Sequence, residues 1–202
     1  MGCECTRASV ETESERLTLR TALMLNAGMF VIGTAVGLWA QSVGILADSL
    51  DMLTDAIAYW LALMAYSRGL AFKKLAARWC GMVLLALGCG IIIEAGHRYL
   101  TGSEPVGLVM MVYSCASFAV NLYVLSLLAA FRRGEVHLRA TYIFTRADVV
   151  ANIALFVSGG IVAATRLQAV DLLLGVGIGL YVSREAVEIL RQANRATDNC
   201  EP

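Results

Sequence analysis

The sequence predicts an all-α membrane protein, a bundle of six transmembrane helices with both termini in the cytoplasm. Hydrophobic residues make up 58% of the 202 residues and charged residues only 16%, whereas soluble domains carry about 25% charged residues. The apolar residues gather in six runs, each long enough to cross the roughly 30 Å hydrocarbon core of a bilayer. The expected helices cover residues 19–39, 43–66, 75–99, 106–131, 140–164 and 170–190.

The segments that flank the six runs are short. Residues 1–18 begin with Cys3-Glu4-Cys5 and continue as the charged stretch ETESERLTLR, with no signal-peptide cleavage site before the first run. Residues 191–202 are mostly polar. We therefore expect a membrane domain over residues 19–190, a short cytoplasmic tail at each end, and no C-terminal cytoplasmic domain.

Each run has the features of an unbroken, closely packed helix. No proline interrupts a run, and Pro105 lies in the short connection before the fourth. The first run carries Gly33 and Gly37 and the sixth carries Gly175 and Gly179, a spacing that lets helix backbones approach closely. Because the connections are short, neighbouring helices should be antiparallel and packed together.

The basic residues set the orientation. Only Arg98 and Arg166 lie on one side of the expected membrane, and Arg146 lies within the fifth run. The positive-inside rule places the richer side, with both termini, in the cytoplasm, and an even number of spans agrees with it. The basic residues of that side are Arg7, Arg16, Arg20, Arg68, Lys73, Lys74, Arg78, Arg132, Arg133, Arg139, Arg184, Arg191 and Arg195.

The second run carries three aspartates in the motif ADSLDMLTD, namely Asp48, Asp51 and Asp55. An ionised carboxylate at the bilayer centre costs on the order of 3 kcal/mol, so these side chains should not face lipid. At about 100° per residue, Asp51 and Asp55 lie about 40° apart and Asp48 about 60° from Asp51 on the same face of the helix. Intramembrane acids of this kind indicate an ion or proton site.

The fifth run carries a second polar group in the motif IFTRADVVAN. Asp148 and Asn152 are four residues apart and share one face, whereas Arg146 lies about 160° from Asp148 around the helix. Arg146 either extends toward the cytoplasmic headgroups or pairs with an acid on another helix.

Asp51, Asp55 and Asp148 can converge on one divalent cation, because carboxylate oxygens are ligands for hard and borderline metal ions. Without an ion the three carboxylates repel one another, so we expect them to hold protons that a metal ion would displace. The alternative is that they pair with Arg146 or cap neighbouring helices. For Asp48, nearer the outer end of its helix, a structural role or a role in ion uptake is favoured over ligation.

These motifs resemble the cation diffusion facilitator family of divalent-metal/proton antiporters. The similar segments are SVGILADSLDMLTD, HLRATYIFTRAD with TRADVVAN, VDLLLGVGIGLYVSREAVEIL and Asn26, and they cover nearly the whole chain. The family's transport site uses two residues four apart on span two and two more on span five. The resemblance therefore implies that Asp51, Asp55 and Asp148 are metal ligands.

The chain departs from the family pattern at Phe144, where the family usually has histidine. The resemblance then implies a site of three acids, with water, Asn152 or nothing as the fourth ligand. Loss of an imidazole weakens the usual preference for zinc-like ions. Family members also continue after span six into a cytoplasmic metal-sensing dimerisation domain, so we expect any homodimer of this chain to form through its membrane helices.

Cys3 and Cys5 form a short thiol pair on the expected cytoplasmic side. They are either incidental residues of a disordered tail or a capture site for a soft metal ion, with Cys200 or His137 as a further ligand. His137, in the connection before the fifth run, is either such a ligand or a polar residue at the membrane interface.

From this pattern we expect a multi-pass protein of the bacterial inner membrane that exports a divalent transition-metal ion in exchange for protons. Zinc is the first expectation, followed by cadmium, cobalt and ferrous iron. We expect no enzymatic activity, no resident cofactor and no nucleic-acid partner, because the chain shows no nucleophile–base pair and no phosphate-binding glycine loop. The alternative is a non-transporting metal-binding subunit or sensor that pairs with a complete homologue.

Overall fold

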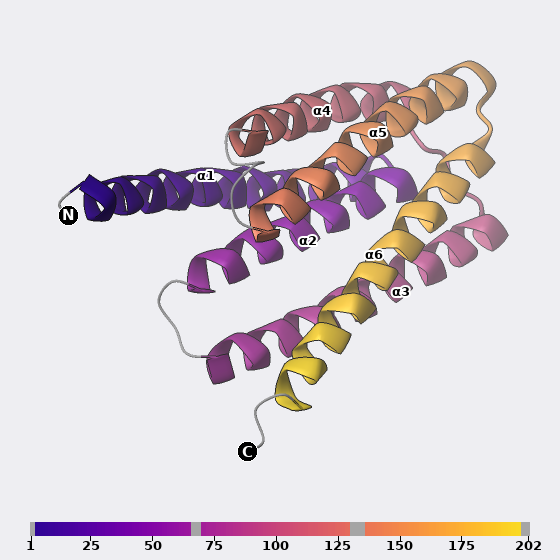
Figure 1. The fold of residues 1–202 in the computed structure, drawn as a ribbon. Helices are drawn as coiled ribbons and strands as arrows, with labels where there is room; N and C mark the ends of the chain where they lie inside the picture. Colours follow the sequence, from indigo (N-terminus) through magenta and orange to yellow (C-terminus); the bar gives the residue numbers. More distant parts are fainter. Residues whose placement is uncertain (1–2, 66–69, 130–135, 199–202) are drawn as a thin grey trace.

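The computed structural model describes residues 3–65, 70–129 and 136–198, and the side chains of residues 13–64, 75, 78–129 and 148–191. Within these residues the protein is entirely helical, and each apolar run coincides with one helix (Figure 1). The helices are α1 (Cys3–Trp39), α2 (Val43–Ala65), α3 (Leu70–Thr101), α4 (Gly107–Ala129), α5 (Val136–Thr165) and α6 (Gln168–Asp198).

Several helices extend beyond the apolar runs into charged sequence. α1 begins at Cys3, so most of the segment expected as an N-terminal tail continues the first helix. This segment contains four glutamates, two arginines and one leucine, which all favour the helical conformation. A helix already formed across the membrane can therefore continue through such residues at low cost, because elongation is far easier than nucleation.

Among the residues whose side chains the structure describes, four helices are long and apolar enough to cross a membrane, over Glu13–Trp39, Arg78–Thr101, Gly107–Ala129 and Asp148–Thr165. α2 carries three aspartates within its apolar stretch, and α6 carries charged residues at both ends of its apolar stretch. Large apolar side chains cover the outer surface, among them Val31, Ile93, Leu108 and Leu173, each more than 60% exposed. An apolar surface of this extent is typical of contact with lipid.

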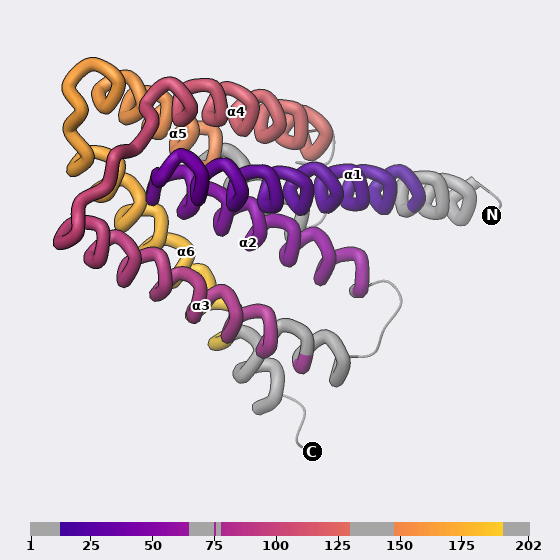
Figure 2. The backbone as a smooth tube through the Cα atoms, turned by 180° about the vertical axis from the view of Figure 1, so that it is seen from behind, coloured from indigo at the N-terminus to yellow at the C-terminus, as the bar shows by residue number. Residues whose placement is uncertain are grey.

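α2 lies at the centre of the bundle and contacts each of the other five helices. α1 packs on α2, α4 packs on α5, and α3 packs on α6, so the third and sixth helices form a pair although they are distant in sequence (Figures 1 and 2). Within the described residues α3 contacts only α2 and α6. The bundle therefore consists of four helices, α1, α2, α4 and α5, with the α3–α6 pair attached through α2 and, to a smaller extent, α5.

The apolar core shows where this pair is attached. One cluster joins Val43 and Leu50 of α2 to Ile91 of α3 and Val182 of α6. Near the other end of α2, the described residues of other helices that cluster with Tyr59 belong to α1 and α4. In Figures 1 and 2 the α3–α6 pair correspondingly diverges from the other helices toward the end of the bundle where the chain begins and ends.

Two glycines allow the closest helix crossings around α2. A side-chain carbon at Gly37 of α1 would come within 2.9 Å of the Leu46 side chain, and one at Gly175 of α6 would overlap Val43. The predicted role of the small-residue spacings in close helix packing is confirmed at these positions.

A buried carboxylate fixes the start of α2 to α6. Asp171 of α6 is fully buried and accepts hydrogen bonds from Ser42 Oγ (2.6 Å), Val43 N (2.8 Å) and Gly44 N (3.0 Å). Ser42 Oγ also accepts a bond from Ile45 N (3.1 Å), as an N-cap residue does. The carboxylate therefore satisfies the free N–H groups at the positive end of the α2 dipole and ties α2 to α6 at this end.

We predict that Asp171→Ala destabilises the protein by about 3 kcal/mol, because three buried donors lose their acceptor. The purified protein in detergent should show a clearly lower melting temperature. Asp171→Asn should lose less stability than Asp171→Ala, since one acceptor oxygen remains.

Glu94→Ala is the matched control. Its carboxylate pairs with Arg98 at 2.7 Å on α3; the Glu94 side chain is 42% exposed and that of Arg98 is 11% exposed, so its removal should cost about 1 kcal/mol, less than Asp171→Ala. A melting temperature of Asp171→Ala equal to that of wild type would contradict the assigned role of the cap.

Candidate metal centre

The predicted acidic residues meet between α2 and α5. Asp51 (8% exposed) and Asp148 (5% exposed) are buried, and Asp55 is half-buried. The carboxyl group of Asp148 lies within hydrogen-bonding reach of the carboxyl groups of both Asp51 and Asp55. Four-residue spacing places Asp51 and Asp55 on one face of α2, and that face is turned toward α5.

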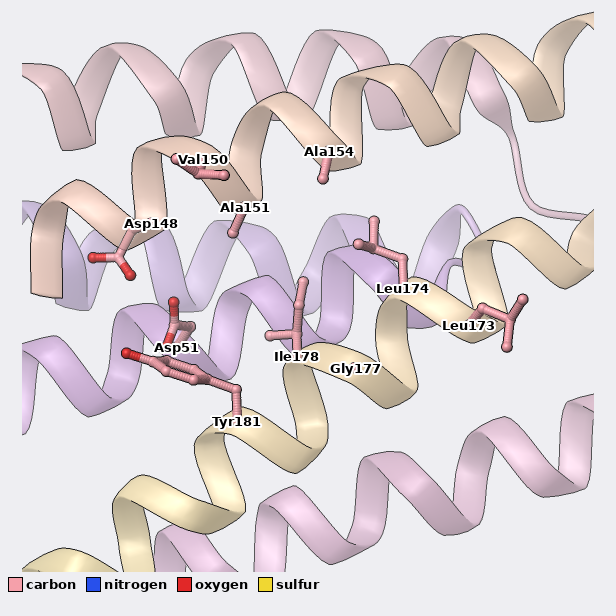
Figure 3. A pocket seen from close by; sticks show the side chains of 10 residues that line it. All are labelled: Asp51, Asp148, Val150, Ala151, Ala154, Leu173, Leu174, Gly177, Ile178 and Tyr181. Carbon is pink, nitrogen blue, oxygen red and sulfur yellow. The ribbon is translucent and has the colours of Figure 1, made fainter.

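A cavity of about 350 Å³ opens beside these acids. Its walls come from α5 and α6, with Asp51 contributed by α2, and Figure 3 shows the Asp51 and Asp148 side chains pointing toward one another at one end. The rest of the wall is apolar and includes Ala151, Leu174 and Ile178. The acids are therefore the polar end of an otherwise apolar cavity within the bundle.

The Asp148 carboxylate has an unused acceptor. Its Oδ2 atom is buried and receives no hydrogen bond from an amide, hydroxyl or amine of the described residues. Such an atom is costly to bury, so it suits a proton or a cation. Among the described residues, no group of three acidic, cysteine or histidine side chains is arranged around one point as metal ligands. The three carboxyl groups approach one another without surrounding a common point.

Asp48 faces a different helix. Its Oδ2 atom accepts hydrogen bonds from Tyr113 Oη and Ser117 Oγ of α4, both at 3.0 Å, and the residue is 2% exposed. These bonds tie the middle of α2 to α4. This arrangement supports a structural role for Asp48, the role that the sequence favoured.

Asn152 lies one turn from Asp148 on α5 but lines another cavity. Its Nδ2 atom donates to the backbone oxygen of Asp148 (2.9 Å), and its Oδ1 atom is buried without a partner. The cavity beside it has a volume of about 290 Å³ and lies between α4 and α5, where Ser114 and Phe118 also contribute. In this conformation Asn152 is not part of the wall that holds Asp51 and Asp148.

Several residues singled out in the sequence lie outside the described side chains. They are Cys3, Cys5, His137, Phe144, Arg146 and Cys200. Their predicted roles in metal capture, in ligation and in charge pairing therefore stay predictions.

The structure adds two residues that the sequence motifs did not single out, Tyr181 and Glu185 of α6. Tyr181 lines the cavity beside Asp51 and Asp148 and interacts electrostatically with both acids (Figure 3). Glu185, one turn further along α6, interacts electrostatically with Asp51 and Asp55. The only signal in the sequence is their four-residue spacing near the end of an apolar run, which does not show which helix they face.

The chain is similar to known transport proteins. Residues 19–196 match the family described as the cation efflux transmembrane domain. Two curated relatives, both named zinc transporter ZitB, come from Yersinia pseudotuberculosis serotype I (strain IP32953) and Yersinia pestis. Each relative is 26% identical to this chain. The matched region covers 92% of this chain but only 63% of the relative's length. The match over most of its length shows that this chain belongs to the cation efflux transmembrane domain family.

Proposed function

We propose that the protein exports a divalent transition-metal ion from the cytoplasm in exchange for protons, and that Asp51, Asp55 and Asp148 bind the ion. The observation that carries this proposal is the approach of the three carboxyl groups inside the bundle, next to a cavity. Membership of a cation efflux family and similarity to proteins named zinc transporters support the same direction of transport.

The carboxyl groups supply the coupling to protons. A hydrogen bond between two carboxyl groups needs a proton on one of them, and Asp148 lies within reach of two such partners. A divalent cation bound by these groups stabilises their ionised forms, so binding releases protons. Protons that return from the other side of the membrane favour release of the ion.

The helix arrangement supports alternating access. The α3–α6 pair is tied to the start of α2 by Asp171 and by apolar packing, and it diverges from the other helices toward the chain termini. A rocking motion of the pair about the tied end would change access to the acids without breaking the four-helix group. We propose six membrane spans, with the charged helices α2 and α6 shielded by their neighbours.

The orientation, assembly and metal are further parts of the proposal. The distribution of basic residues supports termini in the cytoplasm of a bacterial cell, with the protein in the inner membrane. The exposed apolar faces would support a homodimer through membrane helices. Zinc is the first candidate ion, because both relatives are named for it, and cadmium, cobalt and ferrous iron follow.

One observation favours a second candidate function. Phe144 replaces a residue that is usually a ligand, so the chain can instead be a metal-binding subunit or sensor without transport of its own. The transport experiment below distinguishes the two functions.

We predict that proteoliposomes with an acidic interior take up Zn²⁺ through the wild-type protein. Asp51→Ala should reduce uptake to the level of empty liposomes, because one carboxylate of the site is lost. Phe144→His should shift the preference toward zinc, since imidazole favours such ions. The Asp51→Ala protein must keep the wild-type melting temperature for the comparison to hold. Uptake by Phe144→His but not by wild type would move the subunit or sensor function to first place.

Metal binding should distinguish Asp148 of α5 from Asp48 of α2 by role. We predict that Asp148→Asn weakens Zn²⁺ binding at least about tenfold, as expected when a ligand is removed. Asp48→Asn, which makes the same change in charge on the α4 side of α2, should retain most of the affinity. Equilibrium dialysis of the purified protein measures both. Equal losses in the two variants would contradict the assignment of Asp48 to a structural role.

A further inference from the structure

The cavity beside the acids has one neutral polar side chain in its described wall. Ten described residues line this cavity, and only Asp51, Asp148 and Tyr181 among them have polar side chains. Figure 3 shows the Tyr181 side chain reaching from α6 to the end of the cavity where the two aspartates lie, with its hydroxyl at that end. Among the described lining residues, Tyr181 therefore offers the only side-chain hydrogen-bond donor that is not itself an acid.

The packing of α6 holds the Tyr181 ring in place. The side chain is half-buried and packs against the apolar cluster that contains Leu50 of α2 and Val182 of α6. Tyrosine has only two rotatable side-chain bonds, so a packed ring leaves its hydroxyl little freedom of position. The hydroxyl forms no hydrogen bond with another described residue. Of the acids that act on it electrostatically, Asp51 has the largest effect, followed by Glu185.

A bound cation changes the hydrogen bonds that the acids need. Without an ion, the Asp51 and Asp148 carboxyl groups lie within hydrogen-bonding reach of each other, and a proton on one of them serves both. A cation that displaces this proton leaves both groups ionised, so their oxygens accept hydrogen bonds but have lost that donor. A buried acceptor without a donor costs free energy. In the described wall, the Tyr181 hydroxyl is the side-chain group that can supply the missing donor.

We propose that Tyr181 is a positioning residue for the metal ligand Asp51. Its hydroxyl donates a hydrogen bond to the Asp51 carboxylate when the cation is bound, so this carboxylate keeps the orientation that ligation requires. The inference rests on the proposed function, because it takes Asp51 as a ligand of a divalent cation. The buried Asp148 Oδ2 atom, which has no donor among the described residues, independently indicates that a cation is received at this end of the cavity.

The orientation of each acid matters because the chain has few ligands to offer. Phe144 stands where the family usually has histidine, so the three acids carry the ligation. With fewer ligands, each one has a larger share in the affinity. Hydrogen bonds that orient metal ligands typically change metal affinity about 10- to 100-fold.

Zn²⁺ binding to the purified full chain in detergent tests this proposal. Tyr181→Phe removes only the hydroxyl and keeps the ring, and replacement of Tyr181 by para-aminophenylalanine restores a donor at the same position. Tyr113→Phe is the matched control, because it removes a buried hydroxyl that donates to Asp48 on the α4 side of α2. Competition with a zinc indicator gives the affinity, and the melting temperature of the metal-free protein reports its stability. The visible absorption of bound Co²⁺ reports the geometry of the ligands.

We expect Tyr181→Phe to weaken Zn²⁺ binding about tenfold or more and to leave the metal-free melting temperature unchanged, because the hydrogen bond forms only with the ion. The Co²⁺ absorption should change, and para-aminophenylalanine should restore most of the affinity. Tyr113→Phe should lower the melting temperature and keep the wild-type affinity. The loss in Tyr181→Phe should persist in a Glu185→Gln background, which removes the acid of α6 that also acts on Tyr181.

Four results would each overturn the proposal. They are wild-type affinity in Tyr181→Phe, an equal loss in Tyr113→Phe, a loss that para-aminophenylalanine does not restore, and a loss that disappears in the Glu185→Gln background. A wild type that binds Zn²⁺ without transporting it would refute only the proposed export, since the affinities still decide the role of Tyr181. A wild type that binds none of zinc, cadmium or cobalt would refute both.

Discussion

The cost of placing carboxyl groups inside a membrane bundle determines the position of α2. Its three aspartates cannot face lipid without a large loss of solvation free energy. Their helix accordingly lies at the centre, in contact with every other helix, and most of its residues from Val43 to Ala56 are buried. The apolar helices around it supply the outer surface that faces lipid. An acidic helix thus lies at the centre of the bundle, where its neighbours shield its aspartates from lipid.

The buried acids hold α2 to different helices at different depths. Asp171 of α6 binds the start of α2, Asp48 is bound by Tyr113 and Ser117 of α4, and Asp51 and Asp55 approach Asp148 of α5. Asp171 has donors on both carboxylate oxygens, and Asp48 has two donors on Oδ2. The group of Asp51, Asp55 and Asp148 consists of acids alone and leaves one buried acceptor without a donor. A cation that bound there would offset the free-energy cost of burying that acceptor. Carboxylates of the same kind therefore have different surroundings, and among the described residues only this last group has a buried oxygen that lacks an amide or hydroxyl donor.

Much of the candidate site could be predicted, because four-residue spacing on a helix fixes which side chains share a face. Asp51, Asp55 and Asp148 approach one another, and their binding of one cation stays a prediction. Tyr181 and Glu185 could not be predicted in the same way. They lie near the end of an apolar run, and only the packing of α6 beside α2 and α5 shows that they border the acids. Asn152 shares a face with Asp148, yet the space beside it belongs to the α4–α5 contact.

By itself the sequence determined the membrane class, the six helices and the faces on which the acids lie, because hydropathy and helical period are local properties. Only the tertiary structure decided that α3 pairs with α6, that Asp48 faces α4 while Asp51 faces α5, and that Asp171 caps α2. For helices of similar hydropathy, burial alone gives almost the same free energy of packing with one neighbouring helix as with another. Their choice depends on close contacts such as Val43 against Gly175 and on hydrogen bonds between distant residues, and neither is visible in a local pattern.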